Sequence, residues 1–247
     1  MAEFTIQIAG HSGSITSLFD STKDYCRKYW TDRPGEFHFA TTREDLVFEQ
    51  AQLDEEARLE GFRRRRFTDP FLERTAIQRA FAEFLLDHDT LLFHGSALAA
   101  DGQGYLFTAK SGTGKSTHTR LWRETFGPRV TMINDDKPFL RIADDGIQIC
   151  GAPWSGKHGL DEDLTVPLRG ICILHRGSEN RIRPASAEEA LPRILHECYH
   201  PLDEKREDTL RRLAEALAHR VPLWHMECTR DPQAAEVAYR AMSQNFL

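Results

Sequence analysis

The feature that most constrains the fold is a glycine-containing segment between an apolar run and a helical stretch. Its residues are Ala109, Lys110, Ser111, Gly112, Thr113, Gly114, Lys115, Ser116 and Thr117. The run Tyr105 to Phe107 before it is typical of a buried strand, and His118 to Trp122 after it is typical of a helix. In this context, the backbone N–H groups of such a segment surround a phosphate group. The sequence therefore predicts an α/β fold built around a phosphate-binding loop.

The residue types within the loop indicate how a nucleotide would bind. Gly112 and Gly114 let the backbone bend so that successive N–H groups point inward, and the helix that begins at Lys115 adds a favourable dipole. We expect Lys115 to bind the β and γ phosphates and the Ser116 hydroxyl to hold Mg²⁺. Ala109 stands where the strict pattern has glycine, and its methyl group is tolerated if the backbone angles there are ordinary for an L-residue.

A pair of adjacent carboxylates follows the next apolar run. Val130 to Ile133 is a strand candidate, and Asp135 and Asp136 come directly after Asn134 at its end. Open α/β sheets present their ligands at such strand ends. One aspartate would hold Mg²⁺ while the other accepts the proton of an attacking hydroxyl, and which does which stays open. Turn chemistry is the simpler alternative, because Asp-Asp-Lys-Pro is also common in turns.

Four further residues are candidates for the same site. His94 ends a short apolar run, where it would either tune the aspartate base or form an ordinary hydrogen bond in the core. Lys157 and His158 lie in a glycine-rich segment that is typical of a mobile substrate loop, with a plain surface turn as the alternative. Arg169 stands at the entry to a strand, where it would contact substrate phosphate or serve as a structural arginine.

The order and spacing of these motifs resemble the HPr kinase/phosphorylase family, which belongs with the ATP-dependent phosphoenolpyruvate carboxykinases. The resemblance covers His94 to Leu174 and includes Leu168-Arg169-Gly170-Ile171. It implies a P-loop kinase core whose functional positions match His94, Lys115, Ser116, Asp135, Asp136 and Arg169. The N-terminal part and the C-terminal signature of that family are not found. The resemblance therefore implies a related kinase for a small-molecule or peptide hydroxyl.

A second motif indicates a different chemistry. His196-Glu197-Cys198-Tyr199-His200 has the pattern H-E-x-x-H, whose histidines bind zinc when both lie on one face of a helix. On that interpretation the chain would be a zinc metallopeptidase with Glu197 as base. Pro201 follows at once and is expected to end the helix near His200.

The chain is expected to have two parts. Residues 1–90 form an N-terminal α+β region that binds substrate or acts as a lid, with a helix over Ser14 to Tyr29 and a strand over Glu36 to Ala40. Residues 91–247 form the P-loop nucleotide-binding kinase core with C-terminal helices. Between Arg43 and Arg66 the chain is highly charged, and four arginines at its end, Arg63 to Arg66, indicate a solvated face or a patch that attracts phosphate or a partner.

Composition limits the function classes. A net charge of -6 argues against nucleic-acid binding, which normally needs a basic surface. No apolar run approaches the roughly 18 residues of a membrane span, and no signal peptide is evident, so we expect a cytoplasmic protein. The 5 cysteines are scattered and are expected to be reduced. The sequence thus predicts a Mg²⁺-dependent kinase. It leaves open whether the phosphate donor is ATP, ADP or pyrophosphate. A nucleotide-binding sensor without turnover is the alternative, and a homo-oligomer is left open.

Overall fold

The computed structural model describes residues 1–59 and 61–244. Within it the chain divides into two compact units, Met1–Leu85 and Leu86–Leu247. The sequence had placed this boundary after residue 90, within the strand that opens the second unit. Both units mix helices with strands, so the protein is of the mixed α/β class.

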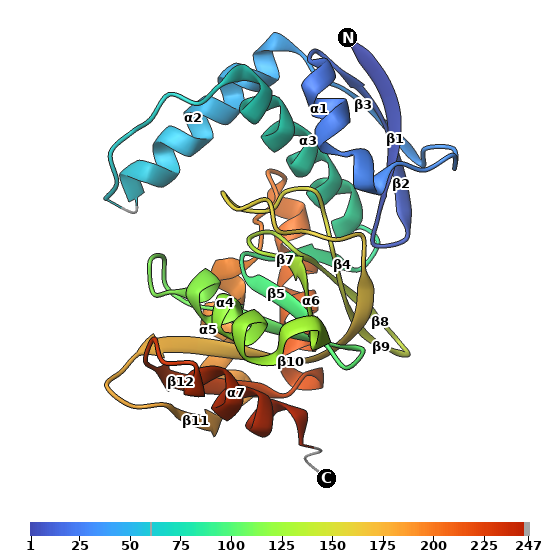
Figure 1. Ribbon diagram of the computed structural model, residues 1–247. Helices are drawn as coiled ribbons and strands as arrows, with labels where there is room; N and C mark the ends of the chain where they lie inside the picture. The colour runs from blue at the N-terminus through green and yellow to red at the C-terminus, as the bar shows by residue number, and fades with distance from the viewer. Residues whose placement is uncertain (60, 245–247) are drawn as a thin grey trace. The chain divides into compact units, whose positions relative to one another are not determined.

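The N-terminal unit consists of a small sheet and the helices that accompany it (Figure 1). Its elements are β1 (Ala2–Ile8), β2 (His11–Ser17), α1 (Asp20–Tyr25), the 3₁₀ turn η1 (Arg27–Tyr29), β3 (Phe37–Ala40), α2 (Arg43–Leu59) and α3 (Asp69–Leu86). Strand β2 pairs antiparallel with β1 and parallel with β3. The Phe37 ring stacks on Phe84 and meets Phe81 edge-on, so α3 packs against the sheet through aromatic contacts.

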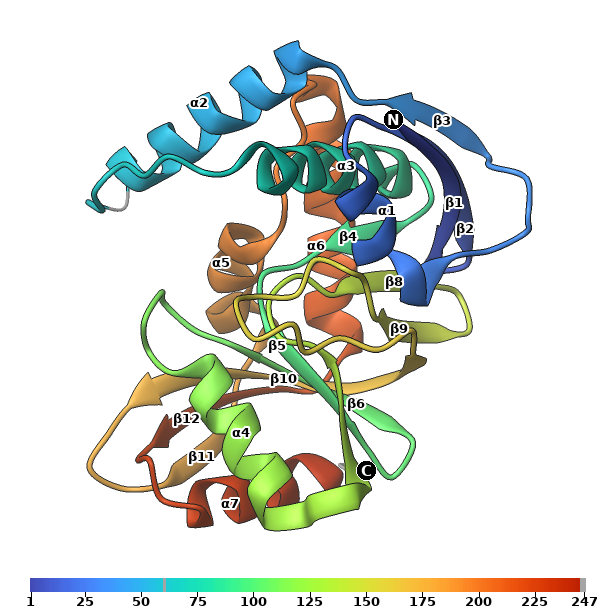
Figure 2. The same cartoon turned by 45° about the horizontal axis from the view of Figure 1, so that its top comes forward.

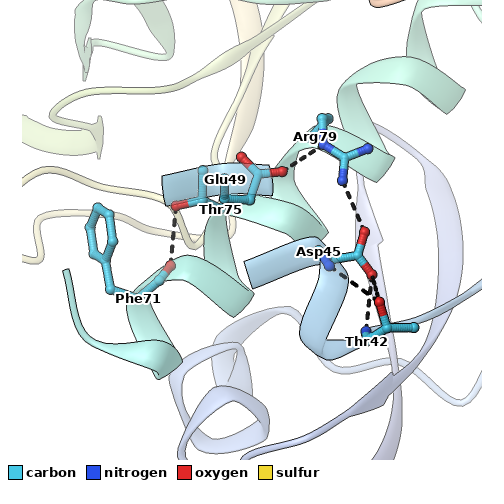
Figure 3. A network of polar contacts seen from close by, with 6 residues as sticks. All are labelled: Thr42, Asp45, Glu49, Phe71, Thr75 and Arg79. Atoms are coloured by element: carbon cyan, nitrogen blue, oxygen red, sulfur yellow. Dashed lines mark hydrogen bonds and ion pairs between the residues drawn. The ribbon is translucent and has the colours of Figure 1, made fainter. Parts of the chain in front are cut away.

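A polar network joins α2 to α3 inside this unit (Figure 3). Arg79 on α3 donates to Glu49 Oε1 over 2.6 Å and to Asp45 Oδ1 over 3.2 Å. The other oxygen of Asp45 accepts hydrogen bonds from the backbone N–H and the hydroxyl of Thr42. Burial raises the pKa of Glu49, and this effect outweighs the opposing influence of Arg79. The first half of α2 is therefore fixed to α3 by a largely buried ion pair.

The helix expected over residues 14–29 is wrong in its first part. Ser14 to Ser17 belong to β2, and the helical segment is limited to α1 and η1. The burial of Ile15 and Ser17 alternates with partly exposed neighbours, as a strand requires, and pairing with both β1 and β3 favours the extended form. The strand expected at residues 36–40 is present as β3.

The C-terminal unit is built on one nine-stranded sheet. Its strands are β4 (Thr90–Leu92), β5 (Ser96–Ala100), β6 (Gln103–Thr108), β7 (Val130–Asn134), β8 (Phe139–Ala143), β9 (Gly146–Cys150), β10 (Thr165–Arg176), β11 (Arg181–Pro184) and β12 (Leu223–Cys228). They follow the order β4-β8-β9-β10-β6-β5-β7, and β12 pairs with both β10 and β11. Strands β6, β10 and β12 are parallel, so their carboxyl ends lie at one edge of the sheet.

Four helices cover the two faces of this sheet (Figure 2). They are α4 (Lys115–Phe126), α5 (Ala187–Glu197), α6 (Glu207–Arg220) and α7 (Gln233–Ser243), with short 3₁₀ turns η2 (Gly127–Arg129) and η3 (Glu204–Arg206). Successive side chains of β6 point to opposite faces of the sheet, so they belong to two separate hydrophobic cores. Tyr105 and Phe107 pack with α4 and α7, whereas Leu106 packs with α5 and α6. The strands predicted at residues 105–107 and 130–133 are thus confirmed as β6 and β7 of one sheet.

Two further expectations from composition can be compared with the described residues. No helix among them is both long enough and apolar enough to cross a membrane. All the cysteines are free, and Cys228 is the least buried of them. Burial raises the pKa of the Cys172 thiol well above its ordinary value, which fits an inert core residue.

Candidate functional site

The predicted phosphate-binding loop lies between β6 and α4, at the carboxyl edge of the parallel strands. Gly112 has a φ of 73° and Gly114 a φ of 123°, so both adopt backbone conformations that favour glycine. Ala109 does not have a positive φ, and its methyl group is buried in the core beneath α4. No side chain of the described residues caps α4 at Gly114, and its first turn has no acidic residue. The start of α4 thus keeps N–H donors for an anion.

Lys115 is partly buried at the base of the loop, with its Nζ atom 3.5 Å from the Ala109 carbonyl oxygen. Burial lowers the pKa of Lys115, while the nearby carboxylates of Glu197 and Asp136 raise it, and burial has the larger effect. The loop lysine therefore shares its surroundings with two carboxylates from distant parts of the chain.

Asp135 is buried and tied to the first turn of α4. Its Oδ1 atom accepts a hydrogen bond of 2.7 Å from the Ser96 hydroxyl, which lies 2.9 Å from the Thr119 hydroxyl. The Thr119 hydroxyl in turn reaches the carbonyl oxygen of Ser116 over 3.3 Å. The Ser116 hydroxyl and the second oxygen of Asp135 have no hydrogen-bond partner among the described residues, so both can serve as metal ligands. Sequence reasoning missed Ser96 and Thr119, because neither belongs to a motif.

Asp136 is more exposed than Asp135 and belongs to a chain of charged groups. His94 lies between two carboxylates, with Nε2 3.3 Å from Asp136 Oδ1 and Nδ1 3.0 Å from Glu197 Oε2. Arg193 donates to the other oxygen of Glu197 over 2.8 Å. Burial raises the pKa of Asp136, but the hydrogen bond from His94 and the positive charges of Lys137, His94 and Lys115 together hold that pKa below its ordinary value.

The position of Glu197 follows from how α5 ends. Glu197 is its last residue, and the His94 backbone N–H donates to the Glu197 carbonyl oxygen over 2.7 Å. The Tyr199 N–H donates to the Leu92 carbonyl, and Phe93 pairs with Cys198, so the chain after α5 is joined to the segment before β5. Burial raises the pKa of Glu197, but hydrogen bonds from His94 and Arg193 and the charges of His94 and Lys115 outweigh it and lower the pKa.

Asn134 organises the turn that carries the two aspartates. Its Oδ1 atom accepts hydrogen bonds from the backbone N–H groups of Asp136 and Lys137, over 2.8 and 2.6 Å. Its Nδ2 atom donates to the Ala152 carbonyl oxygen over 2.7 Å. Asn134 is fully buried, so these bonds fix the direction in which the chain leaves β7. The two aspartates therefore belong to a hydrogen-bonded turn, as the simpler alternative expected. The same turn carries the two candidate site carboxylates.

The glycine-rich segment with Lys157 and His158 lies beside Asp136. A Cβ atom built on Gly156 would be 3.4 Å from the Asp136 Cβ atom. The base of the segment is tied to β7, because Asp135 N–H donates to the Leu160 carbonyl and Glu162 N–H to the Ile133 carbonyl. Lys157 and His158 are exposed and have no hydrogen-bond partner among the described residues. Their predicted role toward substrate stays a prediction.

Arg169 does not lie near the loop, so the predicted contact with substrate phosphate is not supported. Its guanidinium donates to the carbonyl oxygens of Met242, Ser243 and Gln244 at the end of α7. In the register of β10 and β6, the neighbouring Leu168 is opposite Gly104, whereas Ile173 is opposite Thr108. Arg169 is therefore about 13 Å along the strand from the loop edge, at about 3.3 Å per residue.

Arg176 occupies the place on β10 where an arginine reaches the loop. It ends the strand at the carboxyl edge, and its guanidinium donates to the Gly112 carbonyl oxygen over 2.5 Å and to that of Thr113 over 3.5 Å. The sequence contains no motif around Arg176. Its position after a parallel strand, three residues beyond Ile173, is the one signal that could have found it.

The H-E-x-x-H segment does not form the arrangement that zinc binding requires. Because α5 ends at Glu197, His200 is not on the helix, and its Nε2 atom lies 3.1 Å from the Leu195 carbonyl oxygen. The Nδ1 atom of His200 lies beside Glu207, and Glu197 contacts His94 and Arg193. In the described part of the chain, no cluster of metal-ligating side chains includes His196 or His200. The described residues therefore do not support the metallopeptidase alternative.

Comparisons with known proteins give a remote structural likeness and no sequence match. No protein-family model matches the chain, and no curated protein matches it. Among solved structures, the chain is similar to the Hpr(Ser) kinase/phosphatase from Coxiella burnetii, with 12% sequence identity and a TM-score of 0.39. The match covers 62% of this chain and 95% of that chain. A likeness this remote establishes neither a shared topology nor a shared activity.

Proposed function

We propose that this chain is a Mg²⁺-dependent kinase, related to the HPr kinases, that transfers phosphate from ATP or another nucleoside triphosphate to a hydroxyl of a small molecule or peptide. The observation that carries the proposal is that His94 contacts both Asp136 and Glu197, and that these two carboxylates lie close enough to the loop lysine Lys115 to raise its pKa. A phosphate-binding loop alone is compatible with many nucleotide-binding proteins. A partly exposed carboxylate beside its lysine is what a transfer to a hydroxyl requires.

The loop residues bind the phosphates in this proposal. The N–H groups of the turn through Gly112 and Gly114, together with the start of α4, surround the β phosphate, and Lys115 neutralises charge on the transferred group. The free oxygens of Ser116 and Asp135 are the hard donors that Mg²⁺ prefers, so these two residues would hold the ion. When bound, Mg²⁺ shields phosphate charge and keeps the terminal phosphate accessible to attack.

Asp136 is the general base of the proposed reaction. Its depressed pKa keeps it ionised at neutral pH, and its side chain is 37% exposed, so an acceptor hydroxyl can approach it. The hydroxyl oxygen bonds to the terminal phosphorus, the bond to the nucleoside diphosphate breaks, and the hydroxyl proton passes to the Asp136 carboxylate. His94, held by Glu197, orients that carboxylate. In this proposal Lys157 and His158, which belong to the exposed segment beside Asp136, contact the acceptor.

The test uses γ-labelled ATP, Mg²⁺ and a panel of acceptors that includes serine peptides, sugars and nucleosides. Wild-type protein is expected to form a labelled product, Lys115→Ala to lose nucleotide binding, and Asp136→Asn to bind nucleotide normally but lose at least about 100-fold in rate. Lys205→Ala and Asp144→Asn are matched controls at exposed positions of the same unit. Equal nucleotide affinity and equal phosphate transfer in wild type and Lys115→Ala would sink the proposal. Tight binding without product from any acceptor would favour a nucleotide sensor instead.

A further inference from the structure

A groove of about 380 Å³ lies within the N-terminal unit, between the second half of α2 and the segment that returns from it, residues 62–67. Leu53, Ala57, Phe62 and Phe67 give it an apolar lining. The Phe62 side chain is 58% exposed, which is unusual for a large aromatic residue. The groove therefore offers apolar surface that the unit itself does not cover.

Hydrogen bonds hold the return segment in place along α2. The Phe62 N–H donates to the Ala57 carbonyl oxygen over 2.7 Å. Gln50, which is buried, donates to the Arg65 carbonyl oxygen over 2.9 Å and accepts from the Phe67 N–H over 3.1 Å. The groove is therefore preformed, which lowers the entropic cost of binding a ligand.

Four consecutive arginines in this segment supply its charge. Arg63 and Arg65 line the groove, whereas Arg64 and Arg66 do not, as the two-residue alternation of an extended chain predicts. All four are exposed, and none forms a hydrogen bond or ion pair through its guanidinium with a described residue. By contrast, Arg58 on α2 is paired with Glu55, and Arg79 on α3 with Glu49. The arginines of the groove thus keep their donors for a partner.

We propose that this groove docks an acidic peptide segment of a partner polypeptide, with an apolar side chain among Leu53, Phe62 and Phe67 and carboxylates paired with Arg63 and Arg65. Charge complementarity and the apolar lining together favour this occupant. Glu56 also lines the groove and repels a continuous polyanion, so a nucleic-acid backbone fits less well. The groove is lined by residues within 53–57 and 62–67, and its proposed role does not depend on the kinase proposal.

The experiment measures binding of a fluorescein-labelled peptide of twelve residues that carries two leucines among aspartates and glutamates. Wild-type protein is expected to bind it, and the Arg63→Glu/Arg65→Glu variant to bind it at least about tenfold more weakly, because two attractive pairs become repulsive. The Arg64→Glu/Arg66→Glu variant has the same net charge in the same segment but should lose less than about threefold. Phe62→Ala should also weaken binding, and far-UV circular dichroism checks that each variant is folded.

Three results would overturn the docking proposal. The first is equal loss of affinity in the two charge-reversal variants, and the second is equal binding of a peptide whose acids are replaced by asparagine and glutamine. The third is tighter binding of a labelled single-stranded oligonucleotide through Arg63 and Arg65, which would make the groove a nucleic-acid site. Lys115→Ala should bind the peptide like wild type, so failure of the kinase proposal and failure of this one are separable.

Discussion

Replacing Glu197 by glutamine removes the charge that stabilises the His94 and Arg193 end of the site. The Glu197 side chain is 4% exposed and contacts His94 Nδ1 at 3.0 Å and Arg193 Nη1 at 2.8 Å. Loss of one partner from a fully buried ion pair costs about 3–5 kcal/mol. His94 and Arg193 are 33% and 28% exposed, so water partly solvates them in the variant, and glutamine still accepts one hydrogen bond. We therefore expect the free energy of unfolding to fall by about 1–3 kcal/mol at pH 7.

The pH dependence distinguishes the charge of Glu197 from its shape. The folded-state pKa of Glu197 is below its unfolded value, so its contribution to stability is present above the unfolded pKa of about 4.5 and is lost as the pH falls through the folded pKa. The difference between wild type and Glu197→Gln should shrink as the pH falls below about 4.5. A purely steric effect would be the same at every pH.

Urea unfolding followed by circular dichroism, from pH 3.5 to 7.5, measures the difference directly. Glu207→Gln is the matched control, because Glu207 also contacts a histidine, His200, but at 3.3 Å and with a side chain that is 28% exposed. It should cost less than about 1 kcal/mol. A loss below about 0.3 kcal/mol for Glu197→Gln, or a loss that does not change across the pH range, would refute the reasoning.

Three other substitutions test separate parts of the structure. Glu73 is fully buried and accepts hydrogen bonds from the Leu18 and Phe19 N–H groups and from the Thr22 hydroxyl. Glu73→Ala should therefore destabilise the N-terminal unit by about 3–5 kcal/mol in urea unfolding, and Glu73→Gln should destabilise it by less. Arg169→Ala should lower the unfolding free energy by about 1–2 kcal/mol, because the carbonyl oxygens at the end of α7 lose their hydrogen-bond donor. The same variant should leave the KM of any phosphate acceptor unchanged in steady-state assays. Arg176→Ala should raise the Kd for Mg²⁺-ATP about threefold to tenfold in calorimetric titration, whereas Arg181→Ala should not.

The parts of the site that could be predicted from the sequence are those encoded by neighbours in the chain. The strand, loop and helix around Lys115 are consecutive, and their apolar runs, glycines and helix start indicate the local geometry without help from the rest of the fold. The same holds for Asp135 and Asp136, which directly follow β7. In both cases a short strand ends at a loop. Because the strand ends lie at one edge of the sheet, residues in these loops are expected to be close together.

The parts that could not be predicted depend on register and on long-range pairing. Arg169 and Arg176 belong to the same strand, and only the pairing of β10 with β6 decides which of them is at the loop edge. Glu197 was noted for a zinc motif, but the pairing of Phe93 with Cys198 brings it to His94 instead. β5 was missed because serine and alanine give no strand signal, although the sheet buries every residue of it.

The adjacent aspartates acquire different environments because the chain turns between them. Asp135 continues from β7 into the space beneath α4, where Ser96 fixes one oxygen and only 5% of the residue is exposed. Asn134 then holds the N–H groups of Asp136 and Lys137, which directs the Asp136 carboxylate toward His94. A base must meet a hydroxyl that arrives from solvent, whereas a metal ligand must stay fixed near the loop. On these grounds Asp135 suits the metal and Asp136 suits the proton, and Asn134 is the residue on which that division depends.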